Sequence, residues 1–169
     1  SVADPDILKR YNLTGEIVFH DPAMKFIMFG GTAIAGSGTF AGKTAGWASP
    51  GPNSAGTNGI YLEVIVQNVG QGAGQCGGGA GGFAPYTGFI FGKTHLVPGD
   101  RTFENDVANV LFSGKAFQNP AIFNGPWNDW PTTGYVPTSP MVEVYYTQAQ
   151  YNTILASARC GWQTLPAGS

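Results

Sequence analysis

Charged residues are scarce in this sequence, because Asp, Glu, Lys and Arg make up only 11% of its 169 residues. A soluble domain usually carries about 25%. Long solvent-facing helices need charged side chains on their outer surface, so the composition argues against a helical bundle. A surface this neutral is typical of obligate subunit contacts. The alternative interpretation is a secreted domain with neutral polar loops.

Basic segments are absent as well, since Lys9-Arg10 is the only pair of adjacent basic residues and the net charge is −2. A protein that binds nucleic acid neutralises phosphates with a basic stripe or arm. The sequence therefore predicts no direct contact with DNA or RNA.

Long apolar runs are missing too. The most apolar stretch, residues 26–36, is about 11 residues long, whereas a membrane-spanning helix needs about 20. Residues 1–5 (Ser-Val-Ala-Asp-Pro) show no charged-then-apolar signal pattern. This start fits either a leader that has been removed or the loss of an initiator Met.

Cysteine is limited to Cys76 and Cys160, which is too few for a disulfide framework. The sequence has no CxxC spacing, and no His lies near either thiol, so neither is expected to bind a metal. A disulfide within the chain, a disulfide between chains and two free thiols all stay open.

Nucleotide-binding motifs are incomplete. Gly42-Lys43-Thr44 and Gly92-Lys93-Thr94 lack the earlier glycine of a P-loop, whose position is filled by Ser37 and Thr87. Residues 72–77 match GxGxxG, but the sequence that follows does not supply the helix that a dinucleotide site requires. The sequence therefore predicts no cofactor-binding residue and no cofactor.

Catalytic and metal-binding patterns are equally weak. The sequence has no GxSxG nucleophile motif for which His20 or His95 could act as the catalytic base. Glu104 and Asp106, two positions apart, share one face of a strand, and a solvated face explains them better than a Ca²⁺ site or acid catalysis. We predict no catalytic residue and no metal ligand, and hence a protein that is not an enzyme.

Glycine and aromatic residues are what the sequence does contain, with 26 Gly and 13% aromatic residues. This mixture suits β-strands joined by tight turns. Residues Ile60–Val69 form the strongest strand pattern, nearly continuous in apolar residues, which predicts burial on both faces or a sheet junction. Further strands are predicted over Glu16–His20, Lys25–Phe29, Tyr86–Phe91, Thr94–Val97, Thr102–Phe112 and Met141–Tyr146, with a distorted strand over Thr32–Ala41 and a long loop over residues 42–59.

Two helices are indicated by their start signals. Asp4-Pro5 is an N-cap followed by proline at the first helical position, which predicts a short helix over Asp4–Tyr11. Thr147 and Gln150 form a capping box that predicts a helix over Gln148–Cys160, with Gly161 after its end. Strands do not alternate with helices, which disfavours a doubly wound α/β sheet. We predict one mainly β domain over residues 1–169, a single jelly-roll or β-sandwich barrel with a short N-terminal helix and one helix near the C-terminus.

The most informative loop is Gly-Pro-Trp-Asn-Asp-Trp-Pro at residues 125–131. Its two tryptophans either pack down, within the chain or at a subunit contact, or are presented for stacking against a sugar. Trp127, Asn128, Asp129 and Trp130 are therefore candidate contact residues. A second candidate surface is the segment from Phe83 to Tyr86.

The whole pattern resembles the small single jelly-roll major capsid proteins of tailless icosahedral bacteriophages with an internal membrane. The features that carry the resemblance are the strands Ile60–Val69 and Met141–Tyr146, the long Gly/Pro loops, the low charge and the absence of a catalytic set. The resemblance implies a shell built over a lipid vesicle, with the genome shielded by the membrane. It implies a location in the virion, self-association, a second capsid protein as partner and contact with the underlying membrane. It carries over no functional residue.

Three functional hypotheses follow. The leading one is a structural shell protein that self-associates through strand edges, Gly-rich loops and aromatic loops. The alternative is a secreted, lectin-like β-sandwich module that binds carbohydrate through Trp127, Asn128, Asp129 and Trp130. The third is a hydrolase whose site leaves no recognisable motif.

Overall fold

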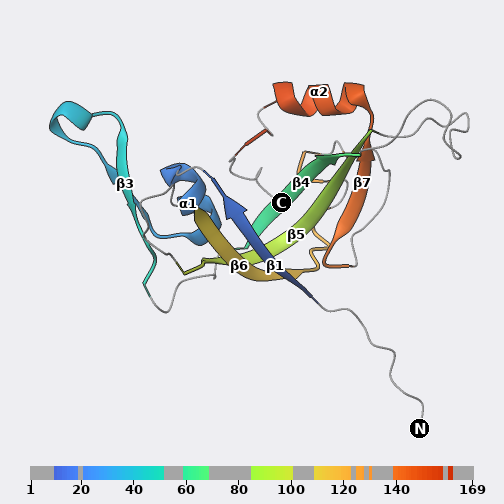
Figure 1. Ribbon diagram of the computed structural model, residues 1–169, viewed down its shortest axis with the longest axis horizontal. Coiled ribbons are helices and arrows are strands. Elements are labelled where there is room, and N and C mark those ends of the chain that lie inside the picture. Colours follow the sequence, from blue (N-terminus) through green and yellow to red (C-terminus); the bar gives the residue numbers. More distant parts are fainter. Residues whose placement is uncertain are drawn as a thin grey trace, which may run out of the picture.

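The protein is mainly β, and its described residues form antiparallel strands and two α-helices (Figure 1). The computed structural model describes residues 10–18, 21–51, 59–68, 85–100, 109–122, 125–127, 130, 139–157 and 160–161. Its elements in chain order are β1 (Tyr11–Ile17), α1 (Pro22–Phe29), β2 (Thr32–Ala35), the 3₁₀ turn η1 (Gly38–Phe40), β3 (Thr44–Ala48), β4 (Ile60–Gln67), β5 (Tyr86–Pro98), β6 (Val110–Phe117), β7 (Val142–Tyr146) and α2 (Gln148–Ala156).

The strands form a five-stranded sheet and a separate two-stranded sheet. In the larger sheet the order is β1-β6-β5-β4, and β7 also pairs with β5. All these pairings are antiparallel. Strands β2 and β3 pair with each other in the smaller sheet. The prediction of a mainly β chain is therefore confirmed.

β5 is the organising strand, because it runs past two separate hydrophobic clusters. Its first half places Tyr86 and Ile90 in a cluster with β7 and α2, which contributes Ile154. Its second half places Leu96 in a cluster with residues of α1, including Met28. The register of β4 and β5 shifts between Ile60 and Leu62, and Ile60 belongs to the cluster at α1 whereas its neighbour Tyr61 packs against the cluster at α2. Because neighbouring side chains of a strand point to opposite sides, the two helices cover opposite sides of the sheet. We call the side that α2 covers the inner face and the opposite side the outer face.

α1 occupies a segment for which the sequence predicted a strand over Lys25–Phe29, so that prediction is wrong. Asp21 is the N-cap, and Pro22 takes the first helical position. The Asp21 carboxylate accepts hydrogen bonds from the amides of Ala23 (2.8 Å) and Met24 (3.4 Å). Asp followed by Pro is the same signal that predicts a helix from residue 4. At residues 21 and 22 this signal starts α1.

Replacing Asp21 with alanine is expected to lower the free energy of unfolding by about 1 kcal/mol, because the first amides of α1 lose their acceptor. Asp21→Asn is the matched control, since its side-chain oxygen still accepts from the same amides and its loss should be smaller. Chemical denaturation followed by circular dichroism measures both. Equal stability of Asp21→Ala and the wild type would show that the cap contributes nothing.

The N-terminal part of the chain differs from its prediction in two ways. Tyr11 was expected to end a helix over Asp4–Tyr11, but it begins strand β1; residues 1–9 lie outside the described part of the chain. The predicted strand Glu16–His20 coincides with the last two residues of β1, and Phe19 and His20 are outside the described residues. Half-buried and exposed positions alternate along β1, which is the pattern of a strand with one covered side.

The segment from Thr32 to Ala48, which we call the arm, is a hairpin and not a distorted strand followed by a loop. β2 takes the first four residues of the predicted strand, η1 forms the turn, and β3 lies within the predicted loop of residues 42–59. Figure 1 shows the arm at the far left, beyond α1 and away from the five-stranded sheet. In the rest of the predicted loop, residues 52–58 are outside the described part of the chain.

The later strands match their predictions better. β4 confirms the strand from Ile60, and β7 confirms the one ending at Tyr146. The expected burial of β4 on both faces is wrong, because β4 lies at the edge of the sheet and exposes Val64 and Val66. The two strands predicted within Tyr86–Val97 are one continuous strand, β5. Residues 102–108 of the predicted strand Thr102–Phe112 are outside the described part, and β6 runs from Val110 to Phe117.

α2 begins as its capping box predicts. The Thr147 hydroxyl accepts from the Gln150 amide (3.2 Å), and the Gln150 side chain accepts from the Thr147 amide (2.8 Å). The helix ends at Ala156, earlier than the predicted Cys160. Gly161 has a positive φ of 95°, as a residue after a helix often does, but it follows a separate turn near Cys160.

Candidate functional site

The outer face of the five-stranded sheet carries apolar side chains that are open to solvent. Leu62, Val64 and Val66 of β4 lie on it, opposite Phe91, Phe89 and Thr87 of β5. Val64 is 45% exposed and Val66 39% exposed, while α2 lies on the inner face. In the described part of the chain, no element packs over these valines. Exposed apolar groups gathered in this way mark a surface that another molecule covers.

β7 extends this surface with a tyrosine and a carboxylate. Tyr145 and Glu143 lie opposite Thr87 and Phe89 of β5, and Tyr145 is 55% exposed. The Tyr145 hydroxyl donates to Glu143 at 3.0 Å. This hydrogen bond, together with the negative charge of Glu143, raises the pKa of Tyr145 above its usual value of 10.0. The outer face therefore has an apolar centre and one acidic position at its β7 side.

The arm is the second exposed apolar feature. All four residues of β2 are exposed, including Ile34, and Phe40 at the tip is 62% exposed. Lys43 is the only charged residue between Thr32 and Ala48. A bulge lies between Ile34 and Ala35, so the pairing of the two strands is irregular near the tip. The arm thus presents neutral small residues around two large apolar side chains.

The base of the arm is fixed to α1. Trp47 donates its indole N–H to the Gly30 carbonyl at 2.8 Å and lies 6.1 Å from the Phe29 ring. The ammonium nitrogen of the largely buried Lys25 is 5.8 Å from the Trp47 ring centroid, close enough for a cation–π contact. A pocket of about 550 Å³ opens here, lined by Pro22, Lys25, Gly46, Trp47, Ser49, Pro98 and Gly99.

A polar cluster centred on Glu63 lies on the inner face. The Glu63 carboxylate accepts from the hydroxyls of Tyr146 at 2.7 Å and Tyr61 at 3.1 Å. Tyr61 in turn accepts from the indole N–H of Trp130 at 3.3 Å, and its ring meets Trp127 edge-on at 5.9 Å. The cluster joins β4 and β7 to the loop that contains the tryptophans, and it satisfies polar groups that would otherwise be costly to bury.

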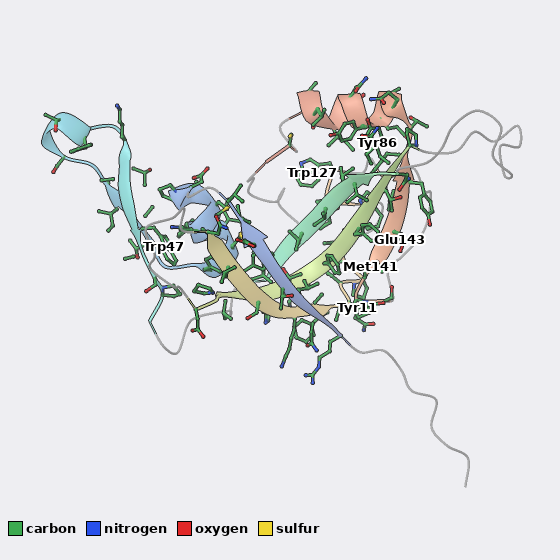
Figure 2. The ribbon with its side chains drawn as sticks, in the orientation of Figure 1. Tyr11, Trp47, Tyr86, Trp127, Met141 and Glu143 are labelled. Carbon is green, nitrogen blue, oxygen red and sulfur yellow. The ribbon has the colours of Figure 1, made fainter. Side chains whose placement is uncertain are left out.

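The candidate contact residues from the sequence are placed differently from one another. Trp130 is only 5% exposed, and Trp127 is half-buried beside it. Tyr86 is buried on the inner face, where its ring stacks on Tyr151 of α2 at 3.9 Å and its hydroxyl donates to Gln148. Figure 2 shows Tyr86 and Trp127 on the side of the sheet that α2 covers, and Glu143 beside β7. Phe83, Asn128 and Asp129 lie outside the described residues.

Of the residues considered for catalysis, metal binding or a disulfide, His95 and Cys160 lie in the described part of the chain. His95 lies in β5 beside the Phe117 ring, at 5.3 Å between centroids. Cys160 is an exposed free cysteine, and Cys76, its proposed disulfide partner, is outside the described residues. His20, Glu104 and Asp106 are outside them as well. Among the residues that the structure does describe, no three His, Cys, Asp or Glu side chains gather as metal ligands would.

The outer-face residues of β7 and the arm were missed by sequence reasoning. Alternation in Val-Glu-Val-Tyr-Tyr at residues 142–146 places Glu143 and Tyr145 on one side of the strand, and this signal was available. The arm has a weaker signal, because Ala, Gly, Ser and Thr dominate its strands. The single aromatic residue at its tip, Phe40, is the feature that could have drawn attention to it.

Comparison with known proteins finds no matching family, no matching curated protein and no matching solved structure. No helix in the described ranges is long and apolar enough to cross a membrane.

Proposed function

We propose that this protein is a structural subunit that self-associates into a larger assembly, as the coat protein of an icosahedral shell does. The observation that carries the proposal is the presence, on one chain, of an uncovered apolar sheet face and an exposed, nearly uncharged arm. Surfaces at obligate subunit contacts are poor in charge and rich in apolar and aromatic groups. Both surfaces here have that character.

The finer features of the proposal follow from the resemblance to small phage capsid proteins. The five-stranded antiparallel sheet would be part of a single jelly-roll barrel, and the assembly would be a virion shell with a second capsid protein and an internal membrane as neighbours. The low charge across the chain agrees with assembly without direct contact to nucleic acid.

Carbohydrate binding, the alternative from the sequence, is less well supported. A sugar site of the expected type needs aromatic faces open to solvent. Trp130 is 5% exposed and uses its indole N–H to bind Tyr61, so it offers no such face. The assembly role is therefore the function that the geometry favours.

Light scattering over a concentration series tests the assembly role. We expect the mean mass to rise above that of the monomer as the protein concentration increases. Because the proposed contacts are apolar, raising the salt concentration should leave association unchanged or strengthen it, whereas association through charges would weaken. A strictly monomeric protein at every concentration and salt level would refute the proposed function.

A further inference from the structure

Beyond its base, the arm has no other element of the described chain to pack against. Within the described residues, β2 and β3 pair only with each other. A two-stranded hairpin alone is marginally stable at best in water. Ile34 is 48% exposed and Phe40 62% exposed, so the large apolar side chains of the arm beyond Trp47 contribute little to holding it in place. The arm therefore has the properties of an element that gains its stability from a surface outside its own hairpin.

The outer face is the second surface that would be stabilised by being covered. Val64, Val66 and the ring of Tyr145 present apolar area to solvent over three neighbouring strands, β4, β5 and β7. Covering these side chains removes apolar area from water, so covering this face is favourable for any partner of fitting shape. β4, the edge strand of this sheet, is free of lysine and proline, which native proteins use to keep an edge from pairing.

We infer that the arm of one copy packs on the outer face of a second copy, with Ile34 and Phe40 against Val64 and Val66. This inference rests on the proposed self-association and names the surfaces that carry it. Charge supports the choice of occupant, because Lys43 is the only charged residue of the arm and Glu143 lies at the β7 side of the outer face. The two side chains have opposite charges and meet at the rim of the contact.

The arm reaches a second copy and not its own sheet. Trp47 fixes its base to Gly30 beside α1, which packs with Leu96 on the second half of β5. Figure 1 shows the arm directed away from β4 and β7. A contact between two different surfaces is heterologous, so each copy uses its arm on one neighbour and its face on another. Such a contact builds rings or shells when the rotation between copies closes.

Mixing two defective variants tests the contact. The arm variant Ile34→Ser/Phe40→Ser keeps an intact face, and the face variant Val64→Lys/Val66→Lys keeps an intact arm. All four positions are exposed, and matching circular dichroism and thermal unfolding verify that both variants fold. We expect each variant alone to associate at least about 100-fold more weakly than the wild type, since each loses two central apolar contacts.

The mixture gives the decisive result. One arm–face pair survives between unlike variants, so an equal mixture should contain a complex of two copies, measured by light scattering, that neither variant forms alone. A contact of arm to arm would let the face variant associate alone, and a contact of face to face would let the arm variant do so. Folded variants that stay monomeric when mixed would overturn the inference. It would be overturned equally if either variant assembled like the wild type, which would leave the proposed function standing. A wild type that never assembles would instead refute the proposed function itself.

A charge swap tests the orientation of the arm. Lys43→Glu and Glu143→Lys should each weaken association several-fold at low salt, because each places like charges together. The double variant restores opposite charges and should recover most of the wild-type affinity. Additive weakening in the double variant would contradict the pairing of these two residues.

Discussion

Replacing Trp130 with alanine is expected to lower the free energy of unfolding by about 3–5 kcal/mol. The indole is 5% exposed and belongs to the cluster that Tyr86, Ile90 and Tyr146 form on the inner face. Its removal leaves a cavity there and also takes away the donor that binds the Tyr61 hydroxyl. Urea denaturation followed by circular dichroism measures the loss.

Two further substitutions separate the causes. Trp130→Phe keeps most of the apolar volume but lacks the N–H, so its loss should be near the roughly 1 kcal/mol of one hydrogen bond plus a smaller packing cost. Trp127→Ala is the matched control, because Trp127 is half-buried and should cost clearly less. If Trp130→Ala unfolded at the wild-type urea concentration, Trp130 would not belong to the core of the protein.

Gly114→Ala is expected to destabilise the protein by about 3 kcal/mol, near the upper end for overpacking. Gly114 lies in β6 between Leu13 of β1 and Leu96 of β5. A Cβ at this position would collide with the backbone carbonyl oxygen of His95 and would lie 2.8 Å from the Leu96 side chain. A backbone atom in a paired strand cannot move aside, so the sheet itself has to shift. Thermal unfolding measures the effect as a lower midpoint.

Gly46→Ala supplies the control for this prediction. Gly46 also lies in a strand, β3, but a Cβ there would meet only the Ile34 side chain, at an ordinary 3.6 Å. The substitution should be neutral or slightly stabilising, because alanine has less freedom to lose on folding. Equal loss at both positions would mean that the close approach at Gly114 is not the cause.

The sequence predicted the elements whose signals are local. β4 and β7 have high β-branched and aromatic content, and α2 has a capping box between Thr147 and Gln150. α1 also has a local signal, Asp21-Pro22, but its apolar run Phe-Ile-Met-Phe suits a strand equally well. A short apolar run does not distinguish the two structures, and the N-cap was the better guide.

The positions of the candidate site residues depend on contacts between distant parts of the sequence. Trp130 is buried because it meets Tyr61, 69 residues earlier, and Tyr146 is held by Glu63, 83 residues earlier. Composition predicted that aromatic residues would matter but not which of them would be covered. The low charge, in contrast, is a property of the whole chain, so the sequence alone could indicate a neutral surface without locating it.

The length of β5 has a consequence for how the protein opens. Because Ile90 and Leu96 tie one strand to two hydrophobic clusters, losing either cluster removes support from a strand that the other also needs. The amides of β5 should therefore be among the slowest to exchange with solvent deuterium, through openings close to global unfolding. The arm, fixed at its base by Trp47, should exchange quickly in the monomer and slow down once a neighbour covers it.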